Sequence, residues 1–406
     1  MTTPKLRFKE FSEDWGSKKI IELADYVDYR GKTPKKVESG VLLVTAKNIK
    51  QGYLDYSASQ EFIEESAFDD VMRRGKVELN DVLITTEAPL GNVASVDRTD
   101  IALAQRVIKY RGKIGLLDNL FLKQKFLSES FQEILKSKAT GGTVQGIKGS
   151  VLHQIPLIVP SKEEQTKIAA FLSAVDEKIS QLSQKHVLLS QYKQGMMQKL
   201  FSQQIRFKAD DGSEFGEWEE KKLSEICIKI KDGTHFSPKT FEVGDYKYLT
   251  SKNVKNGYLD FSKLEYVNKE EHLKIYSSCD VQFGDVLLTK DGTIGQCCVN
   301  TLREEFSLLS SVAFLRLQPE YYNYFLYHLF VSDFGQKEIN GAIAGQALKR
   351  ITLTKINDFS FSFPCLAEQT KIAKFLSTID QKIDVVVQQI EQVKQWKKGL
   401  LQQMFV

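Results

Sequence analysis

The sequence predicts an α+β fold in which two α/β globular domains are joined by two long antiparallel coiled-coil helices, arranged as a pseudo-twofold internal repeat. Residues 160–201 recur without a gap 204 positions later as residues 364–405, and 19 of the 42 aligned positions are identical. Unrelated sequences of ordinary composition would share roughly two or three positions. The chain therefore contains a duplication, and a repeat of this kind decides how the rest of the sequence is divided.

Apolar residues in both copies recur alternately four and three positions apart, which is the period of a coiled-coil seam. The predicted seam of the helix pair is Ile168, Leu172, Val175, Ile179 and Leu182 in the first copy and Ile372, Leu376, Ile379, Ile383 and Val386 in the second. Each seam could instead be the core stripe of a globular helix. Two helices of equal length, about 60 Å each at roughly 1.5 Å per residue, favour packing against each other.

Each globular part is predicted to be a mainly antiparallel sheet followed by one amphipathic helix. The β-prone runs of the first part lie between Gly, Asn and Asp turns, at residues 41–45, 82–86, 93–96 and 106–110. The amphipathic helices are expected at residues 119–138 and 321–339. The resulting division of the chain is globular domains at 1–159 and 204–363, and long helices at 160–203 and 364–406.

The two globular parts match in their framework and differ between the framework segments. Residues 45–57 pair closely with residues 250–262, whereas residues 99–114 have little in common with residues 301–317. This distribution indicates two domains that share one structural framework and recognise different targets. Residues 201–207 also resemble residues 405–406 joined to residues 2–8, so we expect the two chain ends to lie close together.

Composition sets only broad limits. The chain has 406 residues, 27% of them charged, and a net charge of +4, which is compatible with nucleic-acid binding through one local basic face. No run of about 18 apolar residues is present, so we expect no membrane span and a cytoplasmic location. The five cysteines all lie in the second half without CxxC spacing, so neither a disulfide framework nor a metal site is expected.

The head of each long helix carries the pattern Glu-Gln-x-Lys-Ile-Ala-x-Phe-Leu, at residues 164–172 and 368–376. Each globular part opens with a segment of the type Phe-x-x-x-Trp-x-x-Lys-Lys, beginning at Phe11 and at Phe215, in which the second copy has one residue fewer between Phe and Trp. With these motifs in both halves, the whole chain resembles the specificity subunit of type I restriction-modification enzymes.

This resemblance implies two target-recognition domains braced by two antiparallel helices. Each domain would read one half of a split site in double-stranded DNA, and the helices would set the gap between the halves. The resemblance also implies docking of two methyltransferase (M) subunits, with restriction (R) subunits added in the full complex. S-adenosylmethionine, ATP and Mg would belong to those partner subunits, and this chain would bind no cofactor.

Catalytic motifs are not evident in the sequence, which is what a targeting subunit predicts. The methyltransferase tetrapeptide of the Asn-Pro-Pro-Tyr type is absent, and the segments around Lys32 and Lys148 only approach the phosphate-binding P-loop pattern. Two alternatives are kept. One is a coiled-coil scaffold unrelated to DNA, and the other is a self-sufficient DNA-modification enzyme.

Polar loops beside the framework strands are the candidate DNA contacts, because Lys and Arg suit phosphates while Asn, Gln and Arg can read base edges. The candidates in the first half are Arg30, Lys32, Thr33, Lys47, Asn48, Thr143, Gln145 and Lys148. Those in the second half are Lys231, Thr234, His235, Lys252, Asn253, Gln346, Lys349 and Arg350. Each loop could instead be a solvated or turn-holding segment, and the carboxylates of Glu87 and Asp291 could accept from cytosine or cap a turn.

Overall fold

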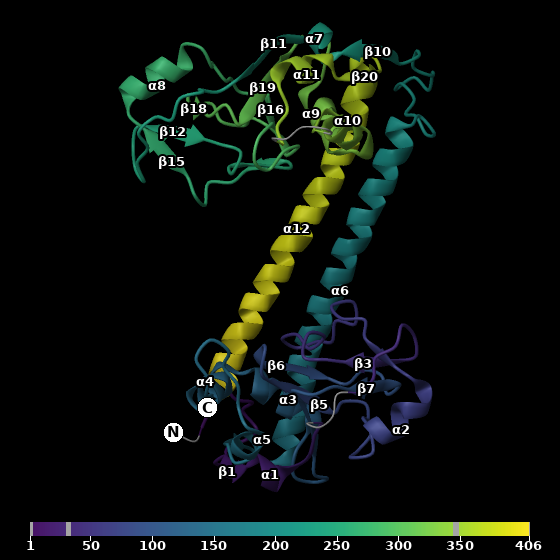
Figure 1. The fold of residues 1–406 in the computed structure, drawn as a ribbon, viewed down its shortest axis with the longest axis vertical. Coiled ribbons are helices and arrows are strands. Elements are labelled where there is room, and N and C mark those ends of the chain that lie inside the picture. The colour runs from purple at the N-terminus through teal and green to yellow at the C-terminus, as the bar shows by residue number, and fades with distance from the viewer. Residues whose placement is uncertain (1–2, 30–33, 344–348, 406) are drawn as a thin grey trace. The chain divides into compact units, whose positions relative to one another are not determined.

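The computed structural model describes residues 3–29, 34–343 and 349–405, and the chain divides into two compact units (Figure 1). Unit 1 comprises Met1–Gln184 and Gln388–Val406, and unit 2 comprises Lys185–Val387. Each long helix therefore contributes one part to each unit. The predicted domain limits at residues 159, 203 and 363 separate globular parts from helices, which is a different criterion, and they stay a prediction.

Unit 1 begins with a globular part of nine strands and five short α-helices within the described residues. Its elements are β1 (Gly16–Lys19), α1 (Ile20–Leu23), β2 (Ala24–Asp28), β3 (Val41–Val44), β4 (Phe62–Ile63), η1 (Glu65–Ala67), α2 (Phe68–Val71), β5 (Val82–Thr86), β6 (Leu90–Ser95), β7 (Ile101–Leu103), β8 (Val107–Gly112), α3 (Asn119–Leu127), α4 (Glu129–Ser137), α5 (Gly149–Leu152) and β9 (Pro156–Val159). The sheets have the orders β2-β8-β5-β6, β4-β3-β7 and β1-β9, and β3–β7 is their one parallel pair in the described part.

Unit 2 repeats this topology. Its elements are β10 (Glu219–Lys222), α7 (Leu223–Ile226), β11 (Cys227–Asp232), β12 (Tyr246–Leu249), β13 (Val254–Lys255), β14 (Tyr258–Leu259), β15 (Glu265–Val267), α8 (Lys269–Tyr276), β16 (Val286–Thr289), β17 (Cys297–Val299), β18 (Ser307–Leu308), β19 (Val312–Leu317), α9 (Asn323–Val331), α10 (Asp333–Ile343), α11 (Leu353–Asp358) and β20 (Ser360–Phe363). The order β11-β19-β16-β17 matches β2-β8-β5-β6, and β15-β12-β18 matches β4-β3-β7. The internal repeat predicted from the sequence is therefore present in the fold.

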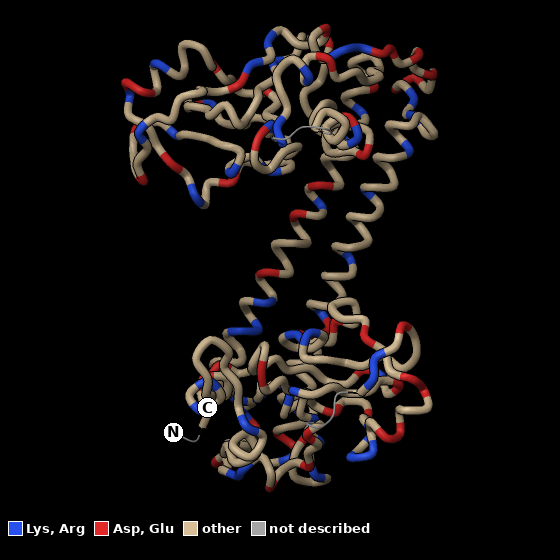
Figure 2. The backbone as a smooth tube through the Cα atoms, in the orientation of Figure 1, with Lys and Arg blue, Asp and Glu red and all other residues tan. Residues whose placement is uncertain are grey.

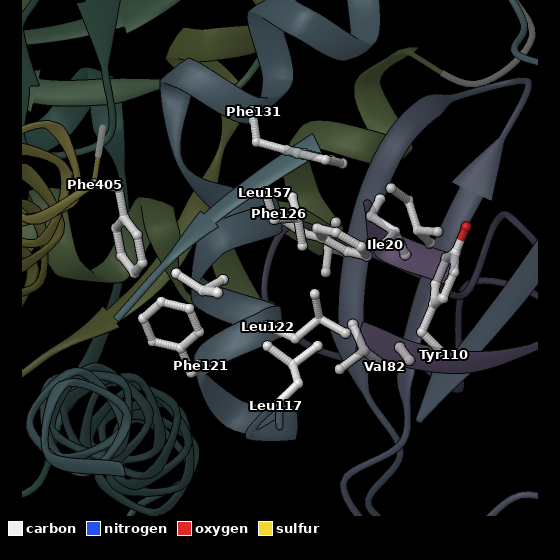
Figure 3. Packing of buried hydrophobic residues seen from close by; sticks show 14 of the residues in the cluster. Ile20, Val82, Tyr110, Leu117, Phe121, Leu122, Phe126, Phe131, Leu157 and Phe405 are labelled. Atoms are coloured by element: carbon white, nitrogen blue, oxygen red, sulfur yellow. The ribbon is translucent and has the colours of Figure 1, made fainter. Parts of the chain in front are cut away.

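β5 and β16, each one of the two inner strands of its four-stranded sheet, are buried on both faces, which explains their largely apolar sequences. Val82 and Ile84 of β5 belong to one hydrophobic cluster, and Leu83 belongs to another. The first cluster joins the sheet to α3, whose Phe121 packs with Phe405 at a ring distance of 5.4 Å (Figure 3). β16 alternates in the same way between two clusters of unit 2. The sheet thus separates two cores in each unit.

The prediction of a single amphipathic helix after each sheet is wrong, because the helix is interrupted at a serine in both copies. Ser128 is extended, with φ −64° and ψ 146°, and it separates α3 from α4. Its hydroxyl donates to Lys125 O at 2.6 Å and accepts from the N–H of Phe131. Ser332 separates α9 from α10 with the same two bonds, to Leu329 O and from Gly335 N–H. A serine that bonds the backbone at both ends of a break stabilises the interruption.

The two long helices are α6 (Lys162–Phe201) and α12 (Leu366–Met404), close to the predicted ranges. In unit 1 the head of α6 and the tail of α12 share one hydrophobic cluster, which contains Ile168, Leu172 and Val175 together with Leu400 and Met404. In unit 2 the head of α12 and the tail of α6 do the same, with Ile372, Leu376 and Ile379 beside Leu200. Of the remaining predicted seam residues, Leu182 and Val386 are buried, and Ile179 and Ile383 are half-buried.

The two chain ends lie together in unit 1, as the sequence predicts (Figure 1). The N–H of Leu6 donates to Gln403 O at 2.9 Å, and in unit 2 the repeat-equivalent N–H of Ile205 donates to Lys199 O at 3.3 Å. The guanidinium groups of Arg7 and Arg206 then pair with the buried carboxylates of Glu164 and Glu368, both at 2.7 Å. The same set of contacts therefore occurs twice, once within a continuous stretch of chain in unit 2 and once between the two chain ends in unit 1.

We expect a circular permutant, with Val406 joined to Met1 and the chain opened between Gln203 and Gln204, to keep the fold. The new junction connects segments that are held as in unit 2, with three more residues between Phe405 and Leu6 than between Phe201 and Ile205, and the new opening resembles the arrangement in unit 1. The free energy of unfolding should therefore change by about 1 kcal/mol or less, which corresponds to a shift of about 2–4 °C in the thermal midpoint. Opening the chain inside β8, which is buried, is the control and should prevent folding.

Candidate nucleic-acid interface

Two asparagines predicted to read bases lie inside the protein instead. Asn48 is fully buried; its Oδ1 accepts from Thr45 N–H at 2.9 Å, and its Nδ2 donates to Asp55 O and Ser59 O. Asn253 is buried in the same way, between Thr250 N–H and Asp260 O. Both side chains therefore hold the turn after β3 or β12 and are not available to a base. This corrects their prediction as DNA contacts.

Thr234 is the third correction. It is 6% exposed, and its hydroxyl accepts from the N–H of Phe236 at 3.3 Å, so it also holds its loop. Four further candidates, Arg30, Lys32, Thr33 and Gln346, lie outside the described residues. The remaining candidates are exposed, namely Lys47, Thr143, Gln145, Lys148, Lys231, His235, Lys252, Lys349 and Arg350. Their contact with DNA stays a prediction.

In unit 1, three segments far apart in sequence meet at the end of β5. The N–H of Thr86 donates to Arg106 O at 2.9 Å, and the N–H of Ile147 donates to Thr86 O at 3.0 Å. Glu87 and Gly146 form a β-bridge beside these bonds. The structure thus places the candidate loop before α5 next to Glu87 and next to the residues that precede β8.

In unit 2, the same bonds hold different residues. The N–H of Lys290 donates to Ser311 O at 2.9 Å, the N–H of Ile351 donates to Lys290 O at 2.9 Å, and Asp291 forms a bridge with Arg350. Thr86 therefore corresponds to Lys290, Glu87 to Asp291 and Arg106 to Ser311. The main chain is held alike in the two units, while the side chains differ in size and charge.

A hollow of about 530 Å³ opens at this junction in unit 1. Glu87, Gln105, Arg106, Thr140 and Lys148 supply its polar lining. The guanidinium of Arg106 lies 3.4 Å from the carboxylate of Glu87, and both side chains are about half exposed, at 55% and 42%. The hollow therefore presents a cation and an anion side by side to the solvent. Of the predicted loop residues, Lys148 lines it, whereas Thr143 and Gln145 are not among its lining residues.

Arg106 lines the hollow but is not among the candidates predicted from the sequence. Its φ is +69°, in the left-handed region that costs a side-chain-bearing residue on the order of 1–3 kcal/mol. Its side chain enters the hollow only because the start of β8 lies beside the end of β5. The one available signal was the divergence of residues 99–114 from residues 301–317, within which Arg106 aligns with a serine.

The equivalent region of unit 2 carries a different ionic cluster. The ammonium of Lys290 is nearly buried and lies 3.3 Å from Asp232 and 3.1 Å from Asp291. His235 faces the other oxygen of Asp232 at 3.3 Å. A hollow of about 340 Å³ beside this cluster is lined by Lys252 and Asp291, among other residues. The structure therefore brings the candidate Lys252 to the same end of the sheet as Asp291.

Charges of both signs are interspersed over each unit (Figure 2). A nucleic acid would therefore be attracted by local groups rather than by a strong overall field. In the described residues, no three or more His, Cys, Asp or Glu side chains are grouped so as to hold a metal ion. The helices in those same residues include none with the length and apolar character of a membrane span.

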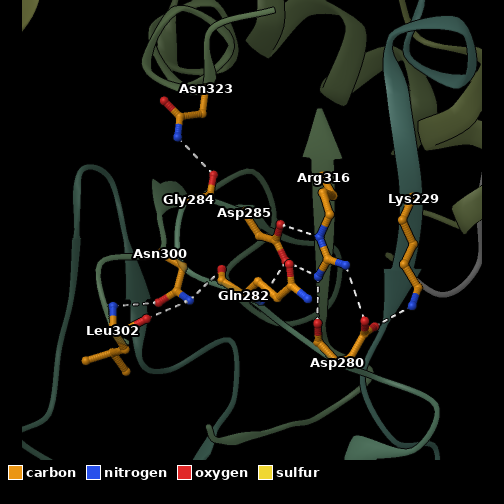
Figure 4. Close-up of polar contacts among 9 residues, drawn as sticks. All are labelled: Lys229, Asp280, Gln282, Gly284, Asp285, Asn300, Leu302, Arg316 and Asn323. Carbon is orange, nitrogen blue, oxygen red and sulfur yellow. Dashed lines mark hydrogen bonds and ion pairs between the residues drawn. The ribbon is translucent and has the colours of Figure 1, made fainter. Parts of the chain in front are cut away.

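An ion pair with a buried aspartate lies just before β5 and just before β16, at the other end of each strand from its junction. In unit 2, Arg316 donates through Nε and Nη2 to the two oxygens of Asp285, at 3.0 and 2.9 Å (Figure 4). Asp285 also accepts from the N–H of Gln282 at 2.8 Å. This hydrogen bonding raises the pKa of Arg316. Arg111 and Asp81 make the same two-pronged contact in unit 1, with both bonds at 2.7 Å.

The tail of each long helix is tied by a lysine to the head of the other. Lys397 pairs with Asp176 in unit 1 and Lys193 with Asp380 in unit 2, both at 2.5 Å. Burial raises the pKa of Asp176, but Lys397 and Lys123 outweigh it, and the net pKa is lowered. At Asp380 burial prevails over Lys193, so its pKa is raised. The two ends of the helix pair are thus alike in geometry and unlike in electrostatics.

The sequence profile of the type I restriction modification DNA specificity domain matches the chain twice, at residues 12–189 and 216–395. The two matches follow the internal repeat and cover more than half of the chain. Each match begins a few residues before the first strand of a globular part, β1 or β10, and ends within the long helix that follows. The junctions described above therefore lie at equivalent places in the two copies of this domain.

Similar proteins agree with this assignment. The type I restriction enzyme MjaVIII specificity subunit of Methanocaldococcus jannaschii is 26% identical over 96% of this chain and 91% of its own length. The type I restriction enzyme MjaIX specificity subunit of the same organism is 24% identical over 95% and 90%. The crystal structure of a type I restriction-modification S subunit from M. genitalium has the same fold, with a TM-score of 0.62 at 18% identity over 100% of this chain and 99% of that one. This chain belongs to the type I restriction modification DNA specificity domain family.

Proposed function

We propose that the chain is the DNA specificity subunit of a type I restriction-modification system, in which each globular domain reads one half of a two-part site. The observation that carries this proposal is that the two units hold equivalent loops with the same main-chain hydrogen bonds but present different side chains there. Main-chain bonds of Thr86 and Lys290 hold the two loops alike, and the side chains presented are Glu87 and Arg106 in one unit and Asp291 and Ser311 in the other. Two different half-sites require such a pair of readers.

The family membership also supports a division of labour with partner subunits. We propose that the helix pair docks two methyltransferase subunits, that restriction subunits complete the complex, and that this chain itself catalyses no reaction. S-adenosylmethionine, ATP and Mg would be bound by those partners. Because the proposed substrate is cellular DNA, we place its action in the cytoplasm.

The first experiment is methylome sequencing of cells that express this chain with its methyltransferase partner. Adenine methylation should appear at a motif of two defined parts separated by an unspecified gap. Methylation by this chain alone would support a self-sufficient enzyme instead. DNA binding that is absent at every salt concentration, with the partner present, would support the scaffold alternative.

The helix pair is proposed to set the length of the gap. Inserting seven residues after Gln184 in α6 and seven after Val387 in α12 keeps the phase of the seam. Each insertion adds about 10 Å at ~1.5 Å per residue, which corresponds to roughly three base pairs at ~3.4 Å each. The methylated motif should therefore keep both halves while its gap grows by about three base pairs.

The control for this prediction is an insertion in one helix only. Helices of unequal length cannot keep both tail-to-head contacts, Lys397 with Asp176 and Lys193 with Asp380. Methylation should then fall sharply at every gap length. An unchanged gap in the doubly extended protein would show that the helices do not set the spacing.

A further inference from the structure

We infer that the hollow of unit 1 is a reading site for one G·C base pair, in which Arg106 recognises guanine and Glu87 orients it. This inference rests on the proposed function, since it names the chemistry that one of the two domains reads. The site comprises Glu87 and Arg106 with Lys148 at its edge, within the hollow of about 530 Å³. Its counterpart in unit 2 presents a serine at the position of Arg106.

The main-chain bonds at the junction occupy some of the groups that line the hollow and leave others free to meet a ligand. Thr86 is 2% exposed, and its hydroxyl donates to Arg106 O at 3.3 Å, so it is committed to the frame. The main-chain groups of Thr86 and Ile147 are bonded as well. The guanidinium of Arg106 and the carboxylate of Glu87 are charged, half exposed and part of the lining of the hollow. These two groups can therefore exchange solvent for a base edge.

The chemistry of this pair selects one kind of base pair. A guanidinium is a planar fork of donors, and guanine offers O6 and N7 as two acceptors in the major groove. A carboxylate accepts, and the cytosine N4 amino group donates on the same base pair. The carboxylate of Glu87, 3.4 Å from the guanidinium of Arg106, also keeps that group near the hollow before DNA arrives. Adenine and thymine offer no such pair of acceptors to the fork.

The conformation of Arg106 indicates that its side chain is kept for a purpose other than folding. The residue has a φ of +69°, where glycine would fit without strain. Its carbonyl makes the bond to Thr86 whatever side chain it carries, as Ser311 does for Lys290 in unit 2. The frame therefore needs the main chain of this residue, and the arginine side chain remains for the ligand.

The surroundings suit approach of a duplex. Lys148 lines the hollow and is exposed, and a lysine at the edge of a base-reading group is placed to meet a phosphate. The loop that carries it contains Gly141, Gly142 and Gly146, and a Cβ at Gly142 would meet nothing within 4 Å. A loop of small residues lets the backbone of DNA come close.

The test uses Arg106→Gly in the intact complex with the methyltransferase partner. Glycine relieves the left-handed strain, so the variant should fold at least as stably as the wild type, as thermal unfolding will show. Methylome sequencing should find one G·C position of one half-site relaxed, with a preference over other base pairs reduced about tenfold to a hundredfold. The other half-site and the gap should stay unchanged.

Arg98→Ala is the matched control, because it removes an exposed arginine paired with Asp100 in the same unit. It should leave the motif unchanged. Glu87→Gln should weaken the same position as Arg106→Gly and no other. A motif that keeps full preference at every position in Arg106→Gly overturns this inference and leaves the two-part reading intact. A wild-type complex that methylates no two-part motif overturns the proposed function itself.

Discussion

Replacing Asp285 by alanine is expected to destabilise unit 2 by about 3 kcal/mol or more. The carboxylate is 2% exposed and accepts three hydrogen bonds, two from Arg316 and one from Gln282 N–H. Within the described residues, its removal leaves the largely buried guanidinium with the carboxylate and carbonyl of Asp280 as its partners, and it leaves a backbone N–H unsatisfied. The arginine sits on β19, whose neighbour β16 leads into the junction at Lys290. Loss of the pair should therefore also loosen the loop that is held at Lys290, at the other end of β16.

Hydrogen exchange measured by mass spectrometry can separate the two units. Exchange in β16 and β19 should accelerate in Asp285→Ala, while β5 and β8 keep the rates of the wild type. Lys247→Ala removes a more exposed partner, that of Glu304, and is the control with an expected change of about 0–1 kcal/mol. A loss below about 1 kcal/mol in Asp285→Ala would contradict the assigned role of the ion pair.

The second large effect is an acid sensitivity of unit 2 that arises at His328 of α9. The imidazole is fully buried; its Nε2 shares a hydrogen bond with Ser377 Oγ at 3.0 Å. Its Nδ1 has no hydrogen-bond partner in the described residues, and Asp380 lies 4.0 Å away. Burial, with a smaller effect from the charge of Lys193, lowers the pKa of His328 to about 3. The backbone of Ala373 raises it slightly.

In the unfolded chain this histidine titrates near its ordinary pKa of about 6.5. Acid therefore protonates the unfolded state first, and the stability that is present above about pH 6.5 is lost as the pH falls toward about 3. Between pH 7 and pH 5 the expected loss is about 2 kcal/mol. Asp380, whose pKa is raised, acts in the opposite direction nearer to its own range. The measurement therefore belongs between about pH 5 and pH 7.

His328→Gln should remove this pH dependence. Glutamine is the residue that unit 1 has at the equivalent position, where Gln124 donates to Asp176 at 2.8 Å. Thermal unfolding of the variant should therefore vary less between pH 5 and pH 7 than that of the wild type. His235→Gln, which changes an exposed histidine of the same unit, is the control and should leave the slope unchanged. An unaltered slope in His328→Gln would contradict the assignment.

The architecture could be predicted from the sequence because its signals are long and repeated. A period of 3.5 residues sustained over 42 positions identifies the long helices, and the apolar run of β5 coincides with the prediction at residues 82–86. The breaks at Ser128 and Ser332 could not be predicted in this way. One polar residue within an apolar stripe fits a continuous helix equally well, and only the bonds of its hydroxyl decide.

The candidate contacts were harder to predict, because the duplication does not distinguish holding a turn from reading a base. Asn48 and Asn253 are shared by the two units and prove to be buried parts of the frame. Arg106 is not shared and lies in the hollow. Divergence between the repeats therefore includes Arg106 where shared residues do not, although the proximity of Arg106 to Glu87 depends on strand pairing that a single sequence does not reveal.

The loops that precede Ile147 and Ile351 are attached to the ends of β5 and β16 through main-chain hydrogen bonds, and this attachment affects how new DNA specificities can arise. Hydrogen bonds from N–H to carbonyl groups can be made by nearly every residue type, so exchanging the side chains carried there requires no repair of the scaffold. Mutation and recombination can therefore alter the bases that are recognised one domain at a time.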